Sequence, residues 1–213
     1  KVFVMENVSG MVKGKMKLVF AEILRELKTC GYKVKAVLMN AMYFGVPQSR
    51  QRMIFVGVRD DIRVEPSHPI AHYSTVPIRD GWQGVNSDGT PFTGKSLELA
   101  VLIPAGDSNG GGKYSKPLNG STNCFGLSRL DWGKPSCTLP KTTILGSSLL
   151  QPDKNERISI GQAQRIGSYP DAYQFIGSFE DKWARIGNSV PPLFMKAIAE
   201  HIRLNILDSV EKA

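Results

Sequence analysis

Residues 1–40 read KVFVMENVSGMVKGKMKLVFAEILRELKTCGYKVKAVLMN, and this stretch decides the fold class. The apolar run at residues 2–5 suits a buried parallel strand. Apolar residues then recur at helical spacing between 15 and 29, and Gly31 stands where a C-terminal helix cap belongs. Because residues 33–40 alternate as a strand does, the stretch predicts strand, helix and strand of an α/β domain.

The rest of the chain changes character twice. Residues 53–58 (MIFVGV) predict a further buried strand, so residues 1–64 form one flank of an open, mostly parallel sheet. Residues 65–156 are rich in Pro, Gly, Ser, Asn and Thr, which predicts a small, irregular lobe. Residues 157–213 predict a short helix at 163–168 and a stronger one at 189–207, with Ser189 as its cap and two prolines in its first turn.

Composition and charge fit a folded protein with a polyanionic partner. The net charge is +8 and the pI is near 9.4. Residues 1–64 hold 12 Lys and Arg against five Asp and Glu, although a solvated basic face explains this excess about equally well. The cysteines (Cys30, Cys124 and Cys137) are odd in number and widely spaced, which argues against a disulfide framework and a zinc site. No stretch approaches the roughly 18 apolar residues of a membrane span.

Two motifs place chemistry beside predicted strands. Glu6 and Asn7 follow the first strand, at the end where open α/β sheets bind ligands. Gln48, Arg50 and Arg52 alternate before the strand at 53–58, and this spacing points all three to one side of an extended chain. The two guanidinium groups offer donors for carbonyl, carboxylate or phosphate oxygens. Taken alone, a Glu-Asn-Val tripeptide is more often an ordinary loop acid, and the alternating residues at 48–52 are also compatible with a solvated strand edge.

A third motif, RIGNSVPP at residues 185–192, predicts a tight turn that leads into a helix. The backbone of Gly187 and Asn188 and the free N–H groups of that helix can bind a polar ligand. For the tripeptide GNS alone, a plain helix cap is the better explanation.

In their order along the chain, these motifs resemble those of the DNA (cytosine-5) methyltransferases. ENV (6–8) is similar to the family's Glu-Asn-Val motif, PQSRQR (47–52) to its Q-x-R-x-R motif, and RIGNSVPP to its closing motif. Residues 157–177 (RISIGQAQRIGSYPDAYQFIG) resemble the family segment that lies between the Q-x-R-x-R motif and the closing motif. Cys137, Thr138 and Leu139 resemble the Thr-Leu pair that ends the family's target-recognition region. The resemblance runs from Lys1 to about Arg203.

The resemblance implies a fold, an activity and partners. The fold is α/β, a partial open sheet of the S-adenosylmethionine-dependent methyltransferase fold with a small target-recognition lobe. Residues 1–64 would be the C-terminal half of the catalytic domain, 65–156 the target-recognition domain, and 157–213 a return segment with a C-terminal helix that packs on the catalytic domain. The family flips a cytosine out of double-stranded DNA and methylates C5 with S-adenosylmethionine as cofactor.

The resemblance also assigns roles to residues. Glu6 would contact N3 and the amine of the cytosine, and donation at N3 requires a protonated carboxyl, which desolvation favours. Arg52 would stabilise O2 and orient Glu6. Asn7, Gln48 and Arg50 would support the base and its loop or contact the DNA backbone, and Asn188 and Ser189 would help close the cofactor pocket. The DNA-reading candidates are Lys113, Lys116, Asn119, Asn123, Arg129 and Thr138.

Two family motifs are absent from the sequence, namely the glycine-rich cofactor loop and the Pro-Cys loop that carries the nucleophile. Thr29, Asn123 and Ser136 precede the three cysteines, so none follows a proline. Lesser departures are Gly161-Gln162, where an acidic residue is frequent, and Gln151-Pro152, where His-Pro is frequent. We therefore expect that the chain alone is inactive and needs a missing N-terminal part, in the same polypeptide or as a second subunit. A start inside a predicted strand favours the first arrangement.

Two other functions remain open at this level. A transfer-RNA cytosine-5 methyltransferase could use the same scaffold, although the long, Gly-rich middle segment suits a sequence-specific DNA enzyme better. A non-catalytic regulatory or DNA-binding subunit could also keep the scaffold, but it has no need of both Glu6 and Arg52. By resemblance, the setting would be restriction–modification in the cytoplasm of a prokaryote, on nucleoid DNA.

Overall fold

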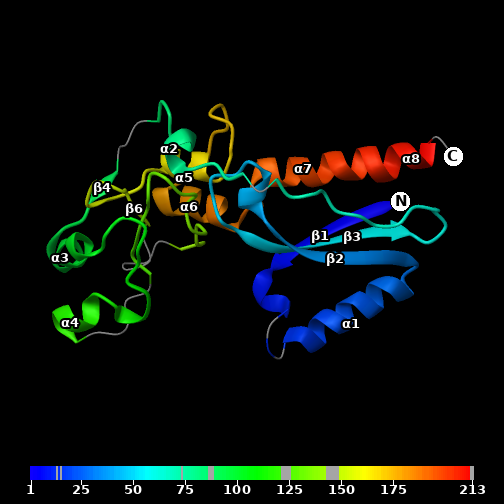
Figure 1. Ribbon diagram of the computed structural model, residues 1–213, viewed down its shortest axis with the longest axis horizontal. Coiled ribbons are helices and arrows are strands. Elements are labelled where there is room, and N and C mark those ends of the chain that lie inside the picture. The colour runs from blue at the N-terminus through cyan, green and yellow to red at the C-terminus, as the bar shows by residue number, and fades with distance from the viewer. Residues whose placement is uncertain are drawn as a thin grey trace. The chain divides into compact units, whose positions relative to one another are not determined.

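The computed structural model describes residues 1–12, 14, 16–72, 74–85, 89–120, 126–142 and 149–211. The chain divides into two compact units. Unit 1 comprises Lys1–Phe44, Arg50–Tyr73 and Leu193–Ala213, and unit 2 comprises Gly45–Ser49 and Ser74–Pro192. The chain therefore leaves unit 1 at Gly45 and again at Ser74, and it returns at Arg50 and at Leu193. The colours of Figure 1, which follow the residue number, let the reader trace this path.

Unit 1 is a three-stranded sheet with helices on its two faces (Figure 1). The strand order is β1-β3-β2, so β3 lies in the middle. Helix α1 covers one face, where its apolar side chains pack with Met53 and Phe55 of β3. Helix α7 lies at the other face, where Phe194 contacts Phe44 with ring centroids 5.2 Å apart. The elements are β1 (Val2–Val8), α1 (Met16–Thr29), β2 (Tyr32–Asn40), β3 (Gln51–Arg59), α7 (Pro192–Ile202), a π-helical turn (Arg203–Leu207), α8 (Asp208–Glu211), and two 3-10 turns (Ser9–Val12 and Ala41–Phe44).

The predicted strands and the first helix are confirmed, but the predicted parallel arrangement is wrong for these strands. Both β1 and β2 pair with β3 in antiparallel register. The reason lies in the connections, because α1 makes the long crossover from β1 to β2. A connection of ten residues then returns the chain from β2 into the centre of the sheet, and so short a link reverses the strand direction. Gly31 has a φ of +81°, as the predicted helix end requires.

Unit 2 is built from short elements around two apolar clusters. One cluster joins α2, α5 and α6 with the buried Leu130, Leu139 and Leu149. The other joins α3 with Leu127 and Leu150. The elements are α2 (Ile78–Gly81), β4 (Thr90–Pro91), α3 (Gly94–Leu102), a 3-10 turn (Gly110–Gly112), α4 (Ser115–Asn119), β5 (Ser128–Arg129), β6 (Leu149–Leu150), β7 (Glu156–Arg157), α5 (Ile160–Ile166) and α6 (Phe179–Asn188). Its strands follow the order β4-β7-β6-β5.

The observed units divide the chain differently from the expected segments at residues 157–192. These residues belong to unit 2 rather than to the sheet. The cause is packing, since Ala163 and Ile166 of α5 and Trp183 and Ile186 of α6 are part of the same buried cluster as Trp82. The predicted assignment of functional domains to these segments stays a prediction. Within the described residues, every helix falls short of the length and apolar run that a membrane crossing needs.

A buried arginine ties the loops of unit 2 together. The side chain of Arg129 is buried, and its five N–H groups reach five acceptors. Nε donates to Ile103 O at 2.6 Å, and the other four bonds are 2.6 to 3.0 Å long. Their acceptors are Gln151 O, Lys154 O, Ala100 O and Asn155 Oδ1. Burial lowers the pKa of Arg129. The prediction that Arg129 reads DNA bases is therefore wrong, because no N–H group is left for a base.

We expect Arg129→Met to lower the free energy of unfolding by about 3 kcal/mol or more, because several buried carbonyl groups lose their donors. Arg129→Lys should give little rescue, since one ammonium group cannot reach acceptors on two separate loops. Urea denaturation followed by circular dichroism measures the change. Arg79→Met, which alters an exposed arginine of the same unit, is the control. A loss no larger than that of the control would contradict the structural role.

Candidate functional site

Glu6 and Arg52 face each other on neighbouring strands of unit 1. In the antiparallel register Glu6 lies opposite Ile54, and Arg52 is two residues along the same strand, so both side chains are on one face of the sheet. Arg52 Nε lies 2.5 Å from Glu6 Oε1. The two side chains are 14% and 27% exposed, which leaves part of each within reach of a ligand. An acid and a guanidinium, brought together from positions 46 residues apart in sequence, thus form a polar site at the sheet.

This geometry agrees with the expected convergence and corrects one detail. Glu6 and Asn7 lie inside β1, which continues to Val8, and not after the strand. The chain stays extended there because β3 pairs along the full length of β1. Arg52 Nη1 also donates to Gln51 O at 2.8 Å, which restrains the guanidinium from a second side. Asn7 Oδ1 accepts a hydrogen bond from Val8 N at 2.8 Å.

Gln48, Arg50 and Arg52 do not form the common site that their alternation predicts. Strand β3 begins only at Gln51, and Gln48 belongs to unit 2. Arg50 is 2% exposed, and its backbone N–H donates to Asn40 Oδ1 at 2.9 Å. Of the two roles expected for Gln48 and Arg50, these buried positions favour support of the loop over contact with the DNA backbone.

Gln48 and Ser49 hold the segment at residues 136–140 in unit 2. Gln48 Oε1 accepts from Leu139 N at 3.3 Å, and Gln48 Nε2 donates to Ile166 O at 3.4 Å. Ser49 N donates to Ser136 O at 2.7 Å, and Thr138 Oγ1 donates to Ser49 O at 2.7 Å. The motif at 47–49 is therefore a structural partner of the motif at 137–139, although 90 residues separate them in the sequence.

The closing motif differs from its predicted conformation. Gly187 and Asn188 are the last residues of α6 and not a tight turn. Ser189 caps the C-terminal end of that helix, with its hydroxyl donating to Ile186 O at 2.8 Å, and does not cap the following one. Helix α7 starts at Pro192, as a proline in a first turn predicts. The amphipathic sequence 178–188 carries its own helix start at Ser178, which the sequence reasoning missed.

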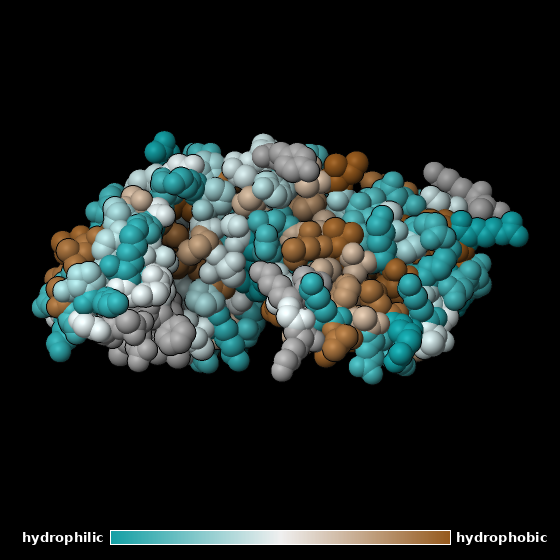
Figure 2. Space-filling model, turned by 60° about the horizontal axis from the view of Figure 1, so that its bottom comes forward, coloured by the Kyte–Doolittle hydropathy of each residue, from teal (hydrophilic) through white to brown (hydrophobic). Residues whose placement is uncertain are grey.

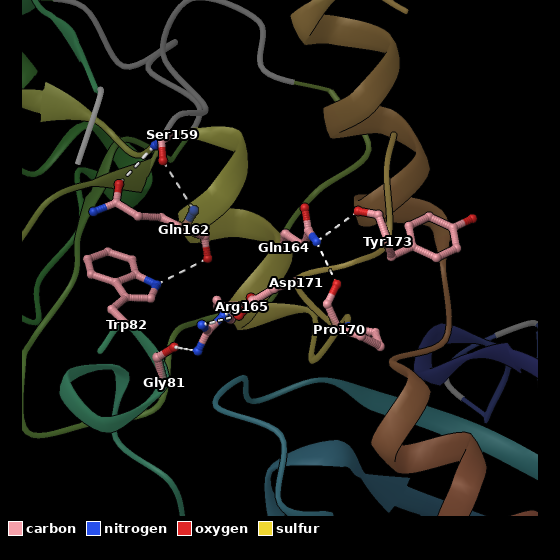
Figure 3. Close-up of polar contacts among 9 residues, drawn as sticks. All are labelled: Gly81, Trp82, Ser159, Gln162, Gln164, Arg165, Pro170, Asp171 and Tyr173. Atoms are coloured by element: carbon pink, nitrogen blue, oxygen red, sulfur yellow. Dashed lines mark hydrogen bonds and ion pairs between the residues drawn. The ribbon is translucent and has the colours of Figure 1, made fainter. Parts of the chain in front are cut away.

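The segment at 157–177 contains helix α5 and a loop that follows it, with hydrogen bonds at both ends of the helix (Figure 3). Ser159 and Gln162 form a reciprocal capping box at the start of α5, and Trp82 Nε1 donates to Gln162 O at 3.1 Å. Gln162, which stands near a frequent acidic position of the family, thus caps a helix. At the other end, Gln164 Nε2 donates to Pro170 O and Tyr173 O, and Arg165 forms an ion pair with Asp171. The signal for this capping box, Ser159 three residues before Gln162, was present in the sequence.

The remaining DNA-reading candidates have different surroundings. Lys113 forms an ion pair with Asp107, which also accepts from Tyr114 Oη at 2.7 Å. These two contacts, that of Lys113 first, lower the pKa of Asp107 to about 2. Lys116 and Asn119 are exposed residues of α4. Thr138 is exposed, and Asn123 lies outside the described residues.

A pocket of about 360 Å³ lies in unit 2, and its lining includes Cys137, the residue before Thr138. Its lining includes the polar residues Ser49, Ser108, Ser128, Ser136 and Lys134. Lys134 Nζ lies 3.3 Å from Asp131 Oδ2. The sequence reasoning did not single out Lys134 or these serines, because they are spread over 88 residues and only the folded chain brings them together.

Comparisons with known proteins agree on one family. The family model described as C-5 cytosine-specific DNA methylase matches residues 1–204. The Type II methyltransferase M1.HphI of Haemophilus parahaemolyticus is 28% identical over 214 residues, which cover 95% of this chain and 56% of the relative. The Type II methyltransferase M.NgoFVII of Neisseria gonorrhoeae is 28% identical over 100% of this chain and 61% of the relative. The chain thus spans less than two thirds of the length of these relatives.

A solved structure supports the fold class. A prophage-encoded E. coli protein, described as a DNA modification methyltransferase, superposes with a TM-score of 0.73 at 17% identity. The superposition covers 100% of this chain and 70% of that one. At this identity the likeness concerns the fold alone, and it confirms the predicted α/β methyltransferase fold class.

Proposed function

Because the chain belongs to the C-5 cytosine-specific DNA methylase family, we propose that it forms the base-binding and DNA-reading part of a DNA cytosine-5 methyltransferase. The complete enzyme would transfer a methyl group from S-adenosylmethionine to C5 of a cytosine flipped out of double-stranded DNA. The observation that carries the proposal is the direct contact of Glu6 and Arg52 at the sheet, 2.5 Å apart.

In this proposal, Glu6 and Arg52 each bind a different part of the cytosine ring. Glu6 is held by Arg52 through one carboxylate oxygen, so the other oxygen can face N3 and the exocyclic amine of a cytosine. Arg52 has donors beyond the one that meets Glu6, and a guanidinium beside O2 stabilises the negative charge that develops on an attacked ring. Their shared face of one rigid sheet keeps both groups in place before the base arrives.

Two polar residues at the end of α6 support the proposal of a cofactor site. Asn188 is an exposed amide at the end of α6, and Ser189 is fixed beside it by its bond to Ile186 O. We propose that these two residues line one wall of that site. When bound, S-adenosylmethionine supplies an electrophilic methyl group.

The open edge of β1 supports the proposal of a further part that brings the cofactor loop and the nucleophilic cysteine. Among the described strands, β1 pairs with β3 on one side only. Such an edge presents unpaired N–H and C=O groups that favour another strand. Apolar side chains also gather on the surface of this unit (Figure 2). The large exposed ones on β1, α1 and β2 are Val4, Val8, Met16, Leu18, Val19 and Leu38.

The test is to mix this chain with a piece that carries the cofactor loop and the Pro-Cys loop, and to supply S-adenosylmethionine labelled in its methyl group. We expect label in double-stranded DNA, at C5 of cytosine by nucleoside analysis, and none with either piece alone. The control is the same mixture with the cysteine of the added piece replaced by serine.

The competing functions give different results in this assay. Label in transfer RNA but not in DNA would favour the transfer-RNA methyltransferase. A complex that forms and binds DNA but transfers no label to either nucleic acid would favour a non-catalytic subunit. Either outcome would overturn the proposed function.

A further inference from the structure

The segment at residues 136–140 of unit 2 is held from two sides by motifs that are distant in sequence. On one side, the loop at 47–49 fixes Ser136, Thr138 and Leu139 through hydrogen bonds with Ser49 and Gln48. Leu139 is 1% exposed and belongs to the buried cluster, so the segment is anchored in the core as well. Thr138 itself remains exposed between these anchors.

On the other side, helix α6 holds Pro140. Trp183 Nε1 donates to Pro140 O at 2.9 Å. One turn further along α6, the backbone of Gly187 lies against the same carbonyl group. A Cβ atom at Gly187 would be 2.2 Å from Pro140 O, which is far too close for any side chain. Only glycine therefore lets the helix approach Pro140 this closely.

Helix α6 is well fixed along its length. Its start has a capping box between Ser178 and Asp181. The ring of Trp183 is 1% exposed and stacks on Phe179 with centroids 5.9 Å apart. The helix ends at Asn188, one residue after the glycine that touches Pro140. A single short helix thus carries both the contact to Pro140 and the exposed amide at its end.

The hydrogen bond between Thr138 and Ser49 fixes the direction in which the Thr138 hydroxyl points. It donates its hydrogen to Ser49 O, so its oxygen is left to accept a hydrogen bond from a base N–H group. Pro140 is two residues further along the chain. A shift of Pro140 would therefore move Thr138 relative to both the 47–49 loop and α6.

We propose that Trp183 is a positioning residue that holds Pro140, and through it the hydroxyl of Thr138, at a fixed distance from the cofactor-side end of α6. This inference rests on the proposed function and on two roles expected from the sequence, the contact of Thr138 with DNA and that of Asn188 with the cofactor. If this unit couples the two contacts, linkage requires that DNA binding changes the affinity for the cofactor by the same factor as cofactor binding changes the affinity for DNA.

The experiment is a double-mutant cycle in the active methyltransferase that contains this chain. We expect Trp183→Phe, which removes the donor and keeps an aromatic ring, to raise KM for target DNA on the order of tenfold with little change in kcat. Thr138→Val should do the same. If Trp183 acts through Thr138, the double variant should be only about as impaired as either single variant, and not about a hundredfold.

Trp82→Phe is the matched control. It also removes an indole donor that meets a backbone carbonyl, Gln162 O at 3.1 Å, in the same buried cluster. We expect a similar fall in melting temperature but an unchanged KM for DNA. Equal effects of the two Trp→Phe changes on KM, or additive effects of Trp183→Phe and Thr138→Val, would overturn the inference.

Two further points keep the test decisive. Should Trp183→Phe fail to fold, Trp183→Met takes its place in the cycle, because its flexible apolar side chain also lacks the donor that meets Pro140 O. The inference and the proposed function also fail in different ways. An unmodified enzyme that transfers no methyl group to DNA refutes the function, whereas an active enzyme with an additive cycle refutes only the role of Trp183.

Discussion

Replacement of Glu6 by glutamine should lower kcat for cytosine methylation by about 100-fold or more, while the affinity for target DNA stays within a few fold. The amide keeps the size of the side chain but cannot hand a proton to N3 of the base, and a positioned general acid contributes on this scale. It also loses the charge that meets Arg52 at 2.5 Å. Single-turnover kinetics measures the chemical step, and fluorescence anisotropy of labelled DNA measures binding.

Glu65→Gln is the matched control for this prediction. Glu65 is also an acid of unit 1 that pairs with a cation, since Lys33 Nζ lies 3.1 Å from its carboxylate. It is mostly exposed and distant in sequence from the motif, so the same change there should leave kcat unaltered. Equal losses of catalysis and of DNA affinity in Glu6→Gln would instead indicate that the carboxylate only supports the structure of the sheet.

The second large effect is expected for Arg52→Ala, with a loss in kcat on the order of 100- to 1000-fold. This size corresponds to the removal of one preorganised donor from a developing negative charge. The variant also frees Glu6 from its partner, so part of the loss comes from a misplaced acid. Arg52→Lys should recover little, because an ammonium group cannot meet Glu6 and a base oxygen with the same planar geometry.

Arg59→Ala on the same strand is the control for Arg52. Arg59 also pairs with a carboxylate, Asp61, at 2.7 Å, but it is half exposed and sits at the opposite end of β3. Its loss should change the rate by less than about twofold, in line with the small value of surface ion pairs. A near-normal rate for Arg52→Ala, measured against this control, would remove Arg52 from the proposed site.

The sequence predicted well where local patterns were strong. Helical spacing ending at Gly31 gave α1, alternation gave β2, and an apolar run gave the buried middle strand β3. The convergence of Glu6 and Arg52 also agrees with the prediction, because strand register turns a period of two into a shared face. Their catalytic roles stay predictions that the variants above test.

Other features depend on packing that no local pattern contains. Arg129 has the side-chain chemistry of a DNA-reading residue, yet its acceptors lie in helix α3 and in loops up to 29 residues away, and these segments enclose the side chain. Gly187 and Asn188 are typical of a turn, yet they end helix α6, and position 187 requires glycine because the Pro140 carbonyl group needs the space. The antiparallel sheet likewise follows from the length of a connection and not from the strands themselves.

The five residues Gly45–Ser49 belong to unit 2, although the sequence on both sides of them belongs to unit 1. A graft that exchanges unit 2 between members of this family, cut only at residues 74 and 192, would therefore leave behind the native partners of the 136–140 segment. The transplanted lobe would meet a foreign Gln48 and Ser49. Chimeras that exchange unit 2 should carry these five residues along with it, even though they lie some thirty positions upstream of the apparent junction.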